Sequence, residues 1–296
     1  MPTNQSRRNA LKNLVAGTAA IGATTVLGSF SNETSNSTTL KGNIQHSACR
    51  WCYGNIPLET LCAEGKKIGL IGIDLVGPSE WPTLKKYNLI STMCNGAEIN
   101  LVDGWNDTNF HSKLIQNYLD MIPLVAKAGY KNLICFSGSR RGKDDETGWK
   151  NCSDGLKKIM STAEQHGVTI VMELLNSKVD HKDYQCDKTA WGVELAKRIG
   201  SPNFKLLYDI YHMQIDEGDV IRTIRTYKDY IGHIHTGGVP GRREIDESQE
   251  LYYPAIMKAI LDLGYKGYVA QEFIPTSNDQ AQQLAALQKA VQICDV

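Results

Sequence analysis

Eight short apolar runs recur along the chain from residue 44, and each is followed by a stretch with the polar and apolar spacing of a helix. Runs of this length and composition are typical of buried strands. We expect strands at IQHSAC (44–49), IGLIGIDL (68–75), NLISTMC (88–94), KNLICF (131–136), VTIVMEL (168–174), FKLLYDI (204–210), YIGHIHT (230–236) and GYVAQEF (267–273). We expect helices over 57–67, from about 79, and over 110–129, 147–166, 187–199, 217–228, 250–263 and 277–293.

The regular alternation of strand and helix predicts a parallel sheet with the helices on its outside. Eight such units in about 250 residues fit a closed (β/α)8 TIM barrel better than an open doubly wound sheet. An open nucleotide-binding sheet would also carry G-x-G-x-x-G after a strand, and none of the runs is followed by that motif. The predicted fold class is therefore α/β, with residues 44–296 as a single barrel domain.

Residues 1–30 differ in kind from the rest of the chain. An Arg-Arg pair at positions 7 and 8 precedes an uncharged stretch, residues 14–30, that is rich in Ala, Gly and Thr. This arrangement resembles a twin-arginine export signal. The alternative is an ordinary amphipathic helix, but no polar face continues after Asn13. We predict an exported protein, periplasmic or attached to a membrane through an uncleaved signal, with residues 31–43 as a disordered polar linker.

Composition and cysteine spacing exclude several classes of protein. The sequence has 32 Lys and Arg against 32 Asp and Glu. No basic surface for nucleic acid or for an anionic membrane is indicated. The eight cysteines are scattered apart from Cys49 and Cys52, and their spacing suits neither a zinc ribbon nor a disulfide scaffold. We expect most of them to be buried free thiols.

The inward faces of the last four strands carry the candidate site. In a barrel strand, alternate residues point into the lumen. The alternation turns four ligand-type side chains inward at the carboxyl ends of the fifth to eighth strands, where active sites of this fold lie: Glu173, Asp209, His235 and Glu272. A single acid at a strand end is more often a helix N-cap or a solvated residue, but four in register on adjacent strands are a rarer pattern.

Three carboxylates that converge in a confined mouth repel one another, and some of them would take up protons. A divalent cation removes this conflict, and carboxylates with one imidazole suit Mn²⁺, Mg²⁺, Co²⁺ or Zn²⁺. We predict one divalent metal ion held by these four residues, because the first four strands offer too few inward ligands for a trinuclear site. His233 lies one layer deeper in the barrel than His235, and we expect it to have a structural role. We expect histidines that fit no such inward pattern, such as His181, to lie at the surface or in packing.

Two of these ligands have the chemistry to move protons as well. Glu173 and Glu272 come from the fifth and eighth strands, so we expect them to flank a substrate held by the metal. One Glu would remove the proton next to a polarised carbonyl, and the other would return a proton at the neighbouring carbon or on the opposite face, through a metal-bound enediolate. This predicts an isomerase or epimerase. The alternatives are a metal-dependent dehydratase or hydrolase on the same scaffold, and a non-catalytic carbohydrate-binding protein that kept the metal site.

The segment 205–275 resembles the C-terminal half of hydroxypyruvate isomerases, and its most specific blocks are DIYHMQ (209–214) and VPGR (239–242). MELLN (172–176) resembles the fifth-strand motif of the same enzymes. They belong to the xylose isomerase-like TIM barrel superfamily, together with ketose 3-epimerases of the tagatose and psicose type.

The resemblance implies roles for particular residues. It implies that the four strand-end ligands bind the metal and that Glu173 and Glu272 form the acid/base pair. It also implies that His212 and Arg242 contact the oxygens of the substrate, with Arg243 as the alternative arginine, and that Asn176 lines the pocket.

Two departures leave the substrate open between a sugar and a hydroxy-keto acid. His235 stands where hydroxypyruvate isomerases have Gln, which is closer to the epimerases. Val179 stands where the epimerases have a further Glu that binds substrate. As partners we expect such a small molecule, no nucleic acid, and a membrane only through an uncleaved signal, while assembly into a homo-oligomer stays open.

Overall fold

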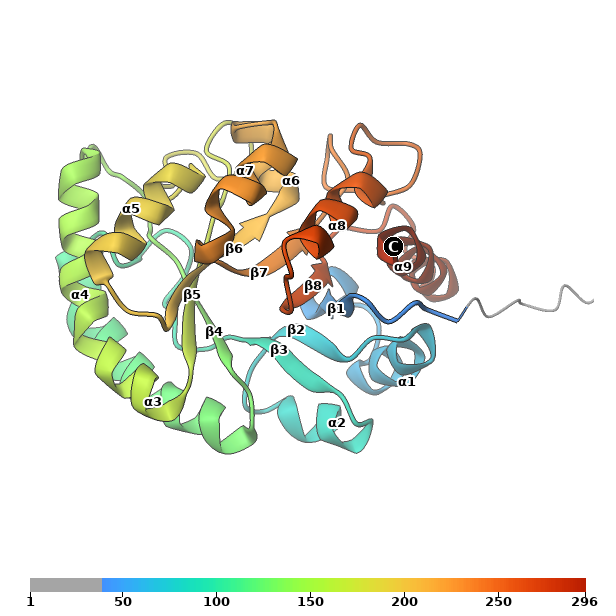
Figure 1. Ribbon diagram of the computed structural model, residues 1–296. Coiled ribbons are helices and arrows are strands. Elements are labelled where there is room, and N and C mark those ends of the chain that lie inside the picture. The colour runs from blue at the N-terminus through green and yellow to red at the C-terminus, as the bar shows by residue number, and fades with distance from the viewer. Residues whose placement is uncertain (1–38) are drawn as a thin grey trace, which may run out of the picture. The chain divides into compact units, whose positions relative to one another are not determined.

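The computed structural model describes residues 39–296, in which eight parallel strands form a closed barrel with the strand order of the sequence (Figure 1). The strands are β1 (Gln45–Cys49), β2 (Gly72–Val76), β3 (Ile90–Cys94), β4 (Asn132–Cys135), β5 (Thr169–Glu173), β6 (Phe204–Asp209), β7 (Ile231–Thr236) and β8 (Tyr268–Gln271). Because β1 pairs with both β2 and β8, the sheet has no free edge. The predicted TIM barrel is confirmed.

Helices follow the strands and surround the barrel (Figure 1). In the described residues these are α1 (Leu58–Ile68), α2 (Trp81–Lys86), α3 (His111–Ala128), α4 (Asp145–His166), α5 (Thr189–Ile199), α6 (Ile210–Asp216), α7 (Val220–Tyr227), α8 (Tyr253–Asp262) and α9 (Gln280–Cys294). Short 3₁₀ turns lie at Arg50–Tyr53, Thr108–Phe110 and Lys228–Tyr230.

The ends of α4 show why these segments form helices where they do. Oδ1 of Asp144 accepts a hydrogen bond of 2.8 Å from the backbone N–H of Thr147, which satisfies a donor that the first turn leaves free. The helix ends at Gly167, whose φ of +65° is the left-handed conformation that favours glycine. In α3 the buried residues Leu114, Tyr118 and Ile122 recur at intervals of four and therefore form one face. Such faces pack on the barrel and make its outer core.

The region after β6 differs from the expected pattern. The sequence predicted a strand to residue 210 and one helix over 217–228, whereas the structure has α6 directly after Asp209 and then α7. The carboxylate of Asp209 makes this possible, because its Oδ1 accepts hydrogen bonds from the N–H groups of Tyr211 (2.8 Å) and His212 (3.3 Å). The helix therefore begins without a loop, and His212 lies in its first turn.

The expected export signal at residues 1–30 lies outside the described residues and stays a prediction. Of the expected linker, the last residues contact the C-terminus: the backbone N–H of Lys41 donates to Asp295 (2.5 Å), and Asn43 Nδ2 donates to the carbonyl of Val296 (2.9 Å). Within residues 39–296, helices of the length and hydrophobicity needed to cross a membrane are absent. All eight cysteines are buried and unpaired within this range, as the sequence analysis expected.

Candidate active site

Strand register brings the four predicted ligands together at the carboxyl end of the barrel. Asp209, the last residue of β6, pairs in register with His235 of β7. Glu173 ends β5, and Glu272 follows β8 by one residue, with its backbone N–H donating to the carbonyl of Thr236 (2.9 Å). One ligand atom of each of the four residues lies within 4.8 Å of the others, and all four side chains are buried.

The Nδ1 atom of His235 faces the carboxylates. It lies 2.5 Å from Oε2 of Glu272 and 3.5 Å from Oε1 of Glu173. This buried nitrogen has no hydrogen-bond partner of normal geometry in the described part of the chain. A basic nitrogen and two carboxylates that share so small a space are a donor set for a cation.

Arg242 places its guanidinium among the same acids. Its Nη2 donates to Oδ2 of Asp209 (2.7 Å) and to Oε2 of Glu272, and its Nε donates to the carbonyl of Glu272 (3.0 Å). The ring of Trp51 lies 5.4 Å from the guanidinium carbon and the ring of Tyr211 lies 5.2 Å from it, which is cation–π range. Of the two arginines considered from sequence, Arg242 thus points into the site, and Arg243 is exposed.

Burial and mutual repulsion set the proton affinity of the three acids. Burial raises the pKa of Asp209 to about 7, although Arg242 lowers it and Glu272 adds repulsion. Burial, and then Glu272, raises the pKa of Glu173. Burial acts on Glu272 as well, but Arg242 and His235 overcome it and hold the pKa of Glu272 well below its usual range. Without a further cation, the site therefore does not hold three ionised carboxylates easily at neutral pH.

The donor set fits a divalent metal ion. Three carboxylates and one imidazole are the ligands that Mn²⁺, Mg²⁺, Co²⁺ and Zn²⁺ accept in proteins. The unpartnered nitrogen of His235 and the raised proton affinities of Asp209 and Glu173 are the two observations that a bound cation would satisfy. Asp209 can serve as ligand and N-cap together, because its Oδ1 caps α6 while its Oδ2 faces the cluster.

The remaining predicted residues lie behind the guanidinium. His212 is fully buried, and its Nε2 accepts a hydrogen bond of 2.7 Å from Nη1 of Arg242. The side-chain nitrogen of Asn176 lies 2.6 Å from Nδ1 of His212. The structure therefore puts Asn176 against His212, and His212 against Arg242. Of the three, Arg242 lines the cavity described next, and the other two do not.

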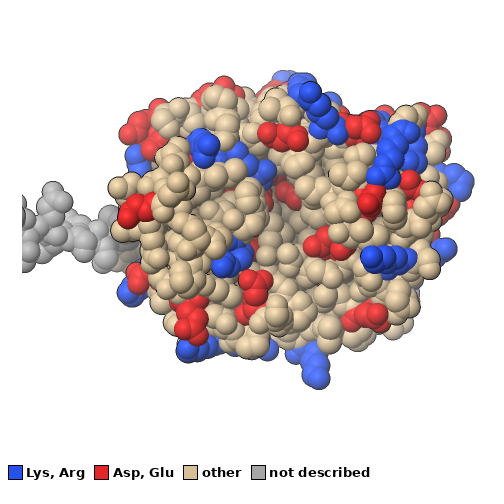
Figure 2. Space-filling view, turned by 180° about the vertical axis from the view of Figure 1, so that it is seen from behind, with Lys and Arg blue, Asp and Glu red and all other residues tan. Residues whose placement is uncertain are grey.

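A cavity of about 660 Å³ opens above the four ligands, and the face of the barrel seen in Figure 2 is hollowed at its centre with mostly uncharged walls. Glu173, Glu272 and Arg242 line its floor. The walls are largely apolar and include Trp51, Leu75, Leu101, Phe136, Leu175, Val179, Ile215, Val239 and Ile274. His181, expected at the surface or in packing, also lines this cavity.

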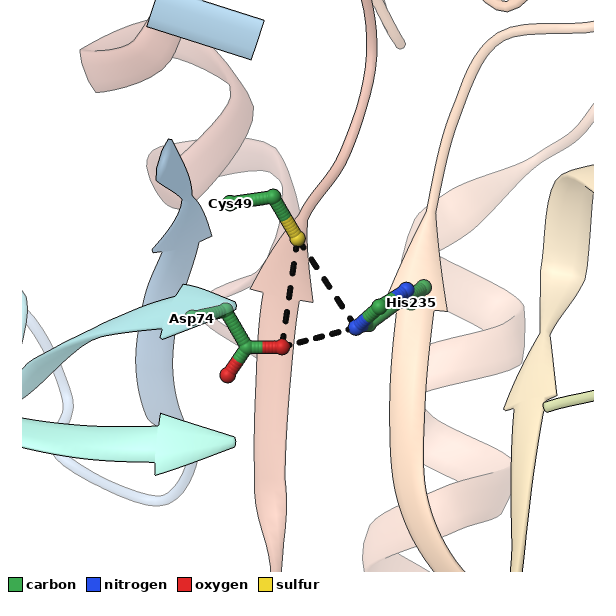
Figure 3. Close-up of side chains that lie close together, drawn as sticks. All are labelled: Cys49, Asp74 and His235. Carbon is green, nitrogen blue, oxygen red and sulfur yellow. Dashed lines mark hydrogen bonds and ion pairs between the residues drawn. The ribbon is translucent and has the colours of Figure 1, made fainter. Parts of the chain in front are cut away.

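Sequence reasoning missed three residues that contact the ligands, Asp74, Cys49 and Trp51, and Figure 3 shows the first two beside His235. Asp74 accepts hydrogen bonds from Nε2 of His235 (2.7 Å) and Nε2 of His233 (2.9 Å), and Cys49 Sγ lies 3.7 Å from Nε2 of His235. Trp51 donates its indole N–H to Oε1 of Glu272 (2.7 Å). A signal for Asp74 was present, since it is an acid in an apolar run, as is Asp209. The contact with Asp74 also gives His233 a structural partner.

Comparison with known proteins relates the chain to a family of TIM barrels that includes isomerases and epimerases. Residues 83–291 match the family described as Xylose isomerase-like TIM barrel. A 2-oxo-tetronate isomerase of Pectobacterium atrosepticum is 31% identical over 234 residues, which are 75% of this chain and 88% of that protein. A D-psicose 3-epimerase of Ruminiclostridium cellulolyticum is 32% identical over 133 residues, 44% of this chain and 42% of that protein.

Other matches are shorter or more distant. A Xenopus laevis protein named after hydroxypyruvate isomerase is 32% identical over 142 residues, 48% of this chain, so the chain spans about half the length of this relative (51%). Among solved structures, a family 2 AP endonuclease from Brucella melitensis superimposes with a TM-score of 0.72 at 23% identity, covering 82% of this chain and 98% of that one. The structural likeness concerns the fold.

Proposed function

The chain belongs to the xylose isomerase-like TIM barrel family, and from this premise we propose that it is an isomerase or epimerase of a small hydroxy-carbonyl compound or sugar. The observation that carries the proposal is the meeting of two glutamates from distant strands at one imidazole. Glu173 and Glu272 both approach Nδ1 of His235, at the floor of the cavity. Two carboxylates on a shared floor can exchange protons with neighbouring carbons, or with the two faces of one carbon, of the same bound substrate.

We propose one divalent ion, Mn, Mg, Co or Zn, with Glu173, Asp209, His235 and Glu272 as its ligands. When bound, such an ion polarises a substrate carbonyl and stabilises the negative charge that develops on its oxygen. The protein supplies the rest: one glutamate accepts the proton next to the carbonyl and the other donates one.

Arg242 is proposed to hold an oxygen of the substrate. It lines the cavity beside Glu272, and its guanidinium is fixed between Trp51 and Tyr211. A planar guanidinium with several N–H donors suits a hydroxyl or a carboxylate. His212 and Asn176 support this arginine from behind through the contact at Nε2 of His212.

The cavity favours a substrate of at least sugar size over a three-carbon acid. Its volume of about 660 Å³ lies in the range of sites that enclose drug-sized ligands, roughly 300–1,000 Å³. The rest of the lining is largely apolar apart from Asp180 and His181, and it includes Val179 at the position where the epimerases have Glu. We therefore propose a sugar or sugar derivative whose hydroxy-carbonyl end meets the floor and whose less polar part contacts Trp51, Val179 and Ile274.

Solvent exchange tests this proposal directly. Full-chain protein is loaded with Mn²⁺, or with Mg²⁺ in the preparation used for NMR. Each preparation is incubated in D₂O with D-fructose, D-tagatose or hydroxypyruvate. We expect the signal of the hydrogen next to the carbonyl to disappear for at least one of them, because a catalytic carboxylate returns solvent deuterium to that carbon. A net loss of water in the mass of the product would instead support the dehydratase alternative.

Two isosteric variants serve as controls for this experiment. Glu173→Gln and Glu272→Gln remove one base each, and we expect exchange to fall by about 10²-fold or more, the usual contribution of a general base. Wild-type exchange rates in both variants would contradict the proposal. Stabilisation of the protein by these sugars with no exchange at all would favour the carbohydrate-binding alternative.

We also propose that the protein acts outside the cytoplasm. The support is the Arg-Arg pair at residues 7 and 8 ahead of an uncharged segment. Replacing both arginines by lysine should retain the protein in the cytoplasm of a bacterium with twin-arginine export, as measured by cell fractionation. Unchanged export of this variant would count against the signal.

A further inference from the structure

We propose that Asp74 is a positioning residue that fixes the ring of His235 so that Nδ1 faces Glu173 and Glu272. This inference rests on the proposed function, because it concerns how the proposed metal ligand is held. Figure 3 shows the side chains of Asp74 and His235 pointing toward each other from two different strands. Asp74 belongs to β2 and His235 to β7, and the two strands are separated by β1 and β8.

The hydrogen bonds of Asp74 define the role of each of its oxygens. Oδ2 lies 2.7 Å from Nε2 of His235 and 2.9 Å from Nε2 of His233. Oδ1 accepts a hydrogen bond from the hydroxyl of Thr92. Asp74 and both imidazoles are fully buried, so water does not compete for these bonds. An ionised carboxylate accepts hydrogen bonds and donates none, so both imidazoles donate from Nε2.

The hydroxyl of Thr92 keeps the carboxylate from turning. Thr92 lies on β3, and its Oγ1 is 2.5 Å from the hydroxyl of Ser47 on β1, which is 3.0 Å from the carbonyl of Gly72. Asp74 is thus held on one side by the hydroxyl of Thr92, which packs against the hydroxyl of Ser47. On its other side it meets the two histidines of β7.

The consequence for His235 follows from the chemistry of imidazole. A neutral imidazole has one N–H and one bare nitrogen, and the partner of the N–H decides which nitrogen is free for a cation. With Nε2 donating to Asp74, the bare nitrogen is Nδ1, and this is the atom that approaches the oxygens of Glu173 and Glu272. Asp74 thereby acts on the site without touching the cavity.

Cys49 offers a different explanation of the same cluster, namely a second ion held by Cys49, Asp74 and His235, whose ligand atoms lie within 4.8 Å of one another. The hydrogen bonds of Asp74 oppose it. Oδ2 already accepts bonds from both imidazoles and a longer one of 3.9 Å from the thiol of Cys49, so this oxygen is fully engaged without an ion.

Asp74→Asn tests the proposal with almost no change of shape. The amide oxygen can keep the bond from Thr92, but the NH₂ group then faces the histidines as a donor. The ring of His235 must accept at Nε2, and its proton moves to the nitrogen that faces the glutamates. We expect the dissociation constant for Mn²⁺, measured by titration calorimetry on metal-free full-chain protein, to rise about 10–100-fold.

Cys49→Ser is the matched control, and we expect its Mn²⁺ affinity to stay within about twofold of wild type at one ion per chain. Two ions per chain in the wild type, with one lost in Cys49→Ser, would overturn the positioning role in favour of the second site. Equal Mn²⁺ affinity of Asp74→Asn and wild type would overturn it too.

Nitrogen-15 NMR of wild-type protein with labelled histidine keeps the test independent of any variant that fails to fold. We expect Nε2 of His235 to carry hydrogen both in the metal-free protein and with Mg²⁺ bound. A bare Nε2 in either state would refute the proposal. If Nε2 carries hydrogen but no metal binds to the wild type, the proposed function fails while the contact with Asp74 stands.

Discussion

Arg242 supplies a fixed positive charge beside two of the three buried carboxylates and offsets part of their repulsion. Its guanidinium donates to Asp209 and Glu272 and is only 11% exposed. Its φ of +55° lies in the left-handed region, which costs a residue with a side chain some conformational energy. That conformation turns the guanidinium inward while the next residue, Arg243, lies at the surface.

Removing the positive charge of Arg242 should destabilise the metal-free protein. We expect Arg242→Met to lower the free energy of unfolding by about 3–5 kcal/mol in the presence of a chelator, because it leaves buried carboxylates without their partner. The loss should be smaller with saturating Mn²⁺. Urea unfolding followed by circular dichroism measures both values. Arg243→Met is the matched control, and we expect it to change stability by less than about 0.5 kcal/mol; equal losses in the two variants would contradict this account.

At the scale of elements, the strands could be predicted and the contacts between distant strands could not. Period-two alternation located Asp209 and His235, because each ends an apolar run on its inward face. The same rule applies to Asp74, but its partners His233 and His235 are 159 and 161 residues away. In addition, the register of β2 with β3 shifts around Asp74, and Leu75 has a φ of +58°. Alternation alone cannot represent such irregularities.

Helix α6 was missed for a local reason. Sequence patterns mark a helix by a loop and a cap before it, whereas α6 begins at the last residue of a strand. Asp209 is at once strand end, N-cap and proposed ligand. From sequence, Asp209 was predicted to be a metal ligand. The N-cap role, which was the alternative for such a residue, is carried by its Oδ1 atom.

Two substitutions at Asp209 separate the cap from the ligand. Asn caps helices about as well as Asp, and Ala does not cap them. We expect both Asp209→Asn and Asp209→Ala to weaken Mn²⁺ binding at least tenfold. In metal-free protein, Ala should be less stable than Asn by about 1 kcal/mol, the usual value of an N-cap. Chemical denaturation with a chelator gives this difference. Equal stability would mean that Asp209 does not hold α6.

At the scale of the whole molecule, closure of the barrel creates the site. Glu173 and Glu272 are 99 positions apart in sequence and reach the same imidazole because β5 to β8 are consecutive strands of the curved sheet. The pairing of β8 with β1 then closes the barrel and brings Asp74 of β2 to the same ring. The sequence predicted this closure from the number of strand and helix units. It could not predict the tilt of the strands, which decides that Asp74 lies beneath His235 and that His212 lies behind Arg242. Binding of the proposed metal ion would therefore be a property of the folded barrel, and we expect it to stabilise the fold.

The dependence of this stabilisation on pH is the sharpest global test. Burial raises the pKa of Asp209 to about 7, against about 3.9 in an unfolded chain. Between these values the folded metal-free protein holds a proton that the unfolded chain has released, so this residue's contribution to stability is full below pH 4 and declines as pH rises toward 7. A bound cation needs the ionised carboxylate and opposes that decline.

We therefore expect Mn²⁺ at about 100 times its dissociation constant to add about 2.7 kcal/mol to the free energy of unfolding at pH 8. This corresponds to a rise in Tm of roughly 5–10 °C. At pH 5.5 the same Mn²⁺ concentration should add much less. Differential scanning calorimetry with Mn²⁺ or EDTA measures both shifts. Asp209→Asn, which has no proton to lose there, should show a small shift at either pH. A shift of equal size at pH 5.5 and pH 8 in the wild type would show that Asp209 is not a ligand whose proton the ion displaces.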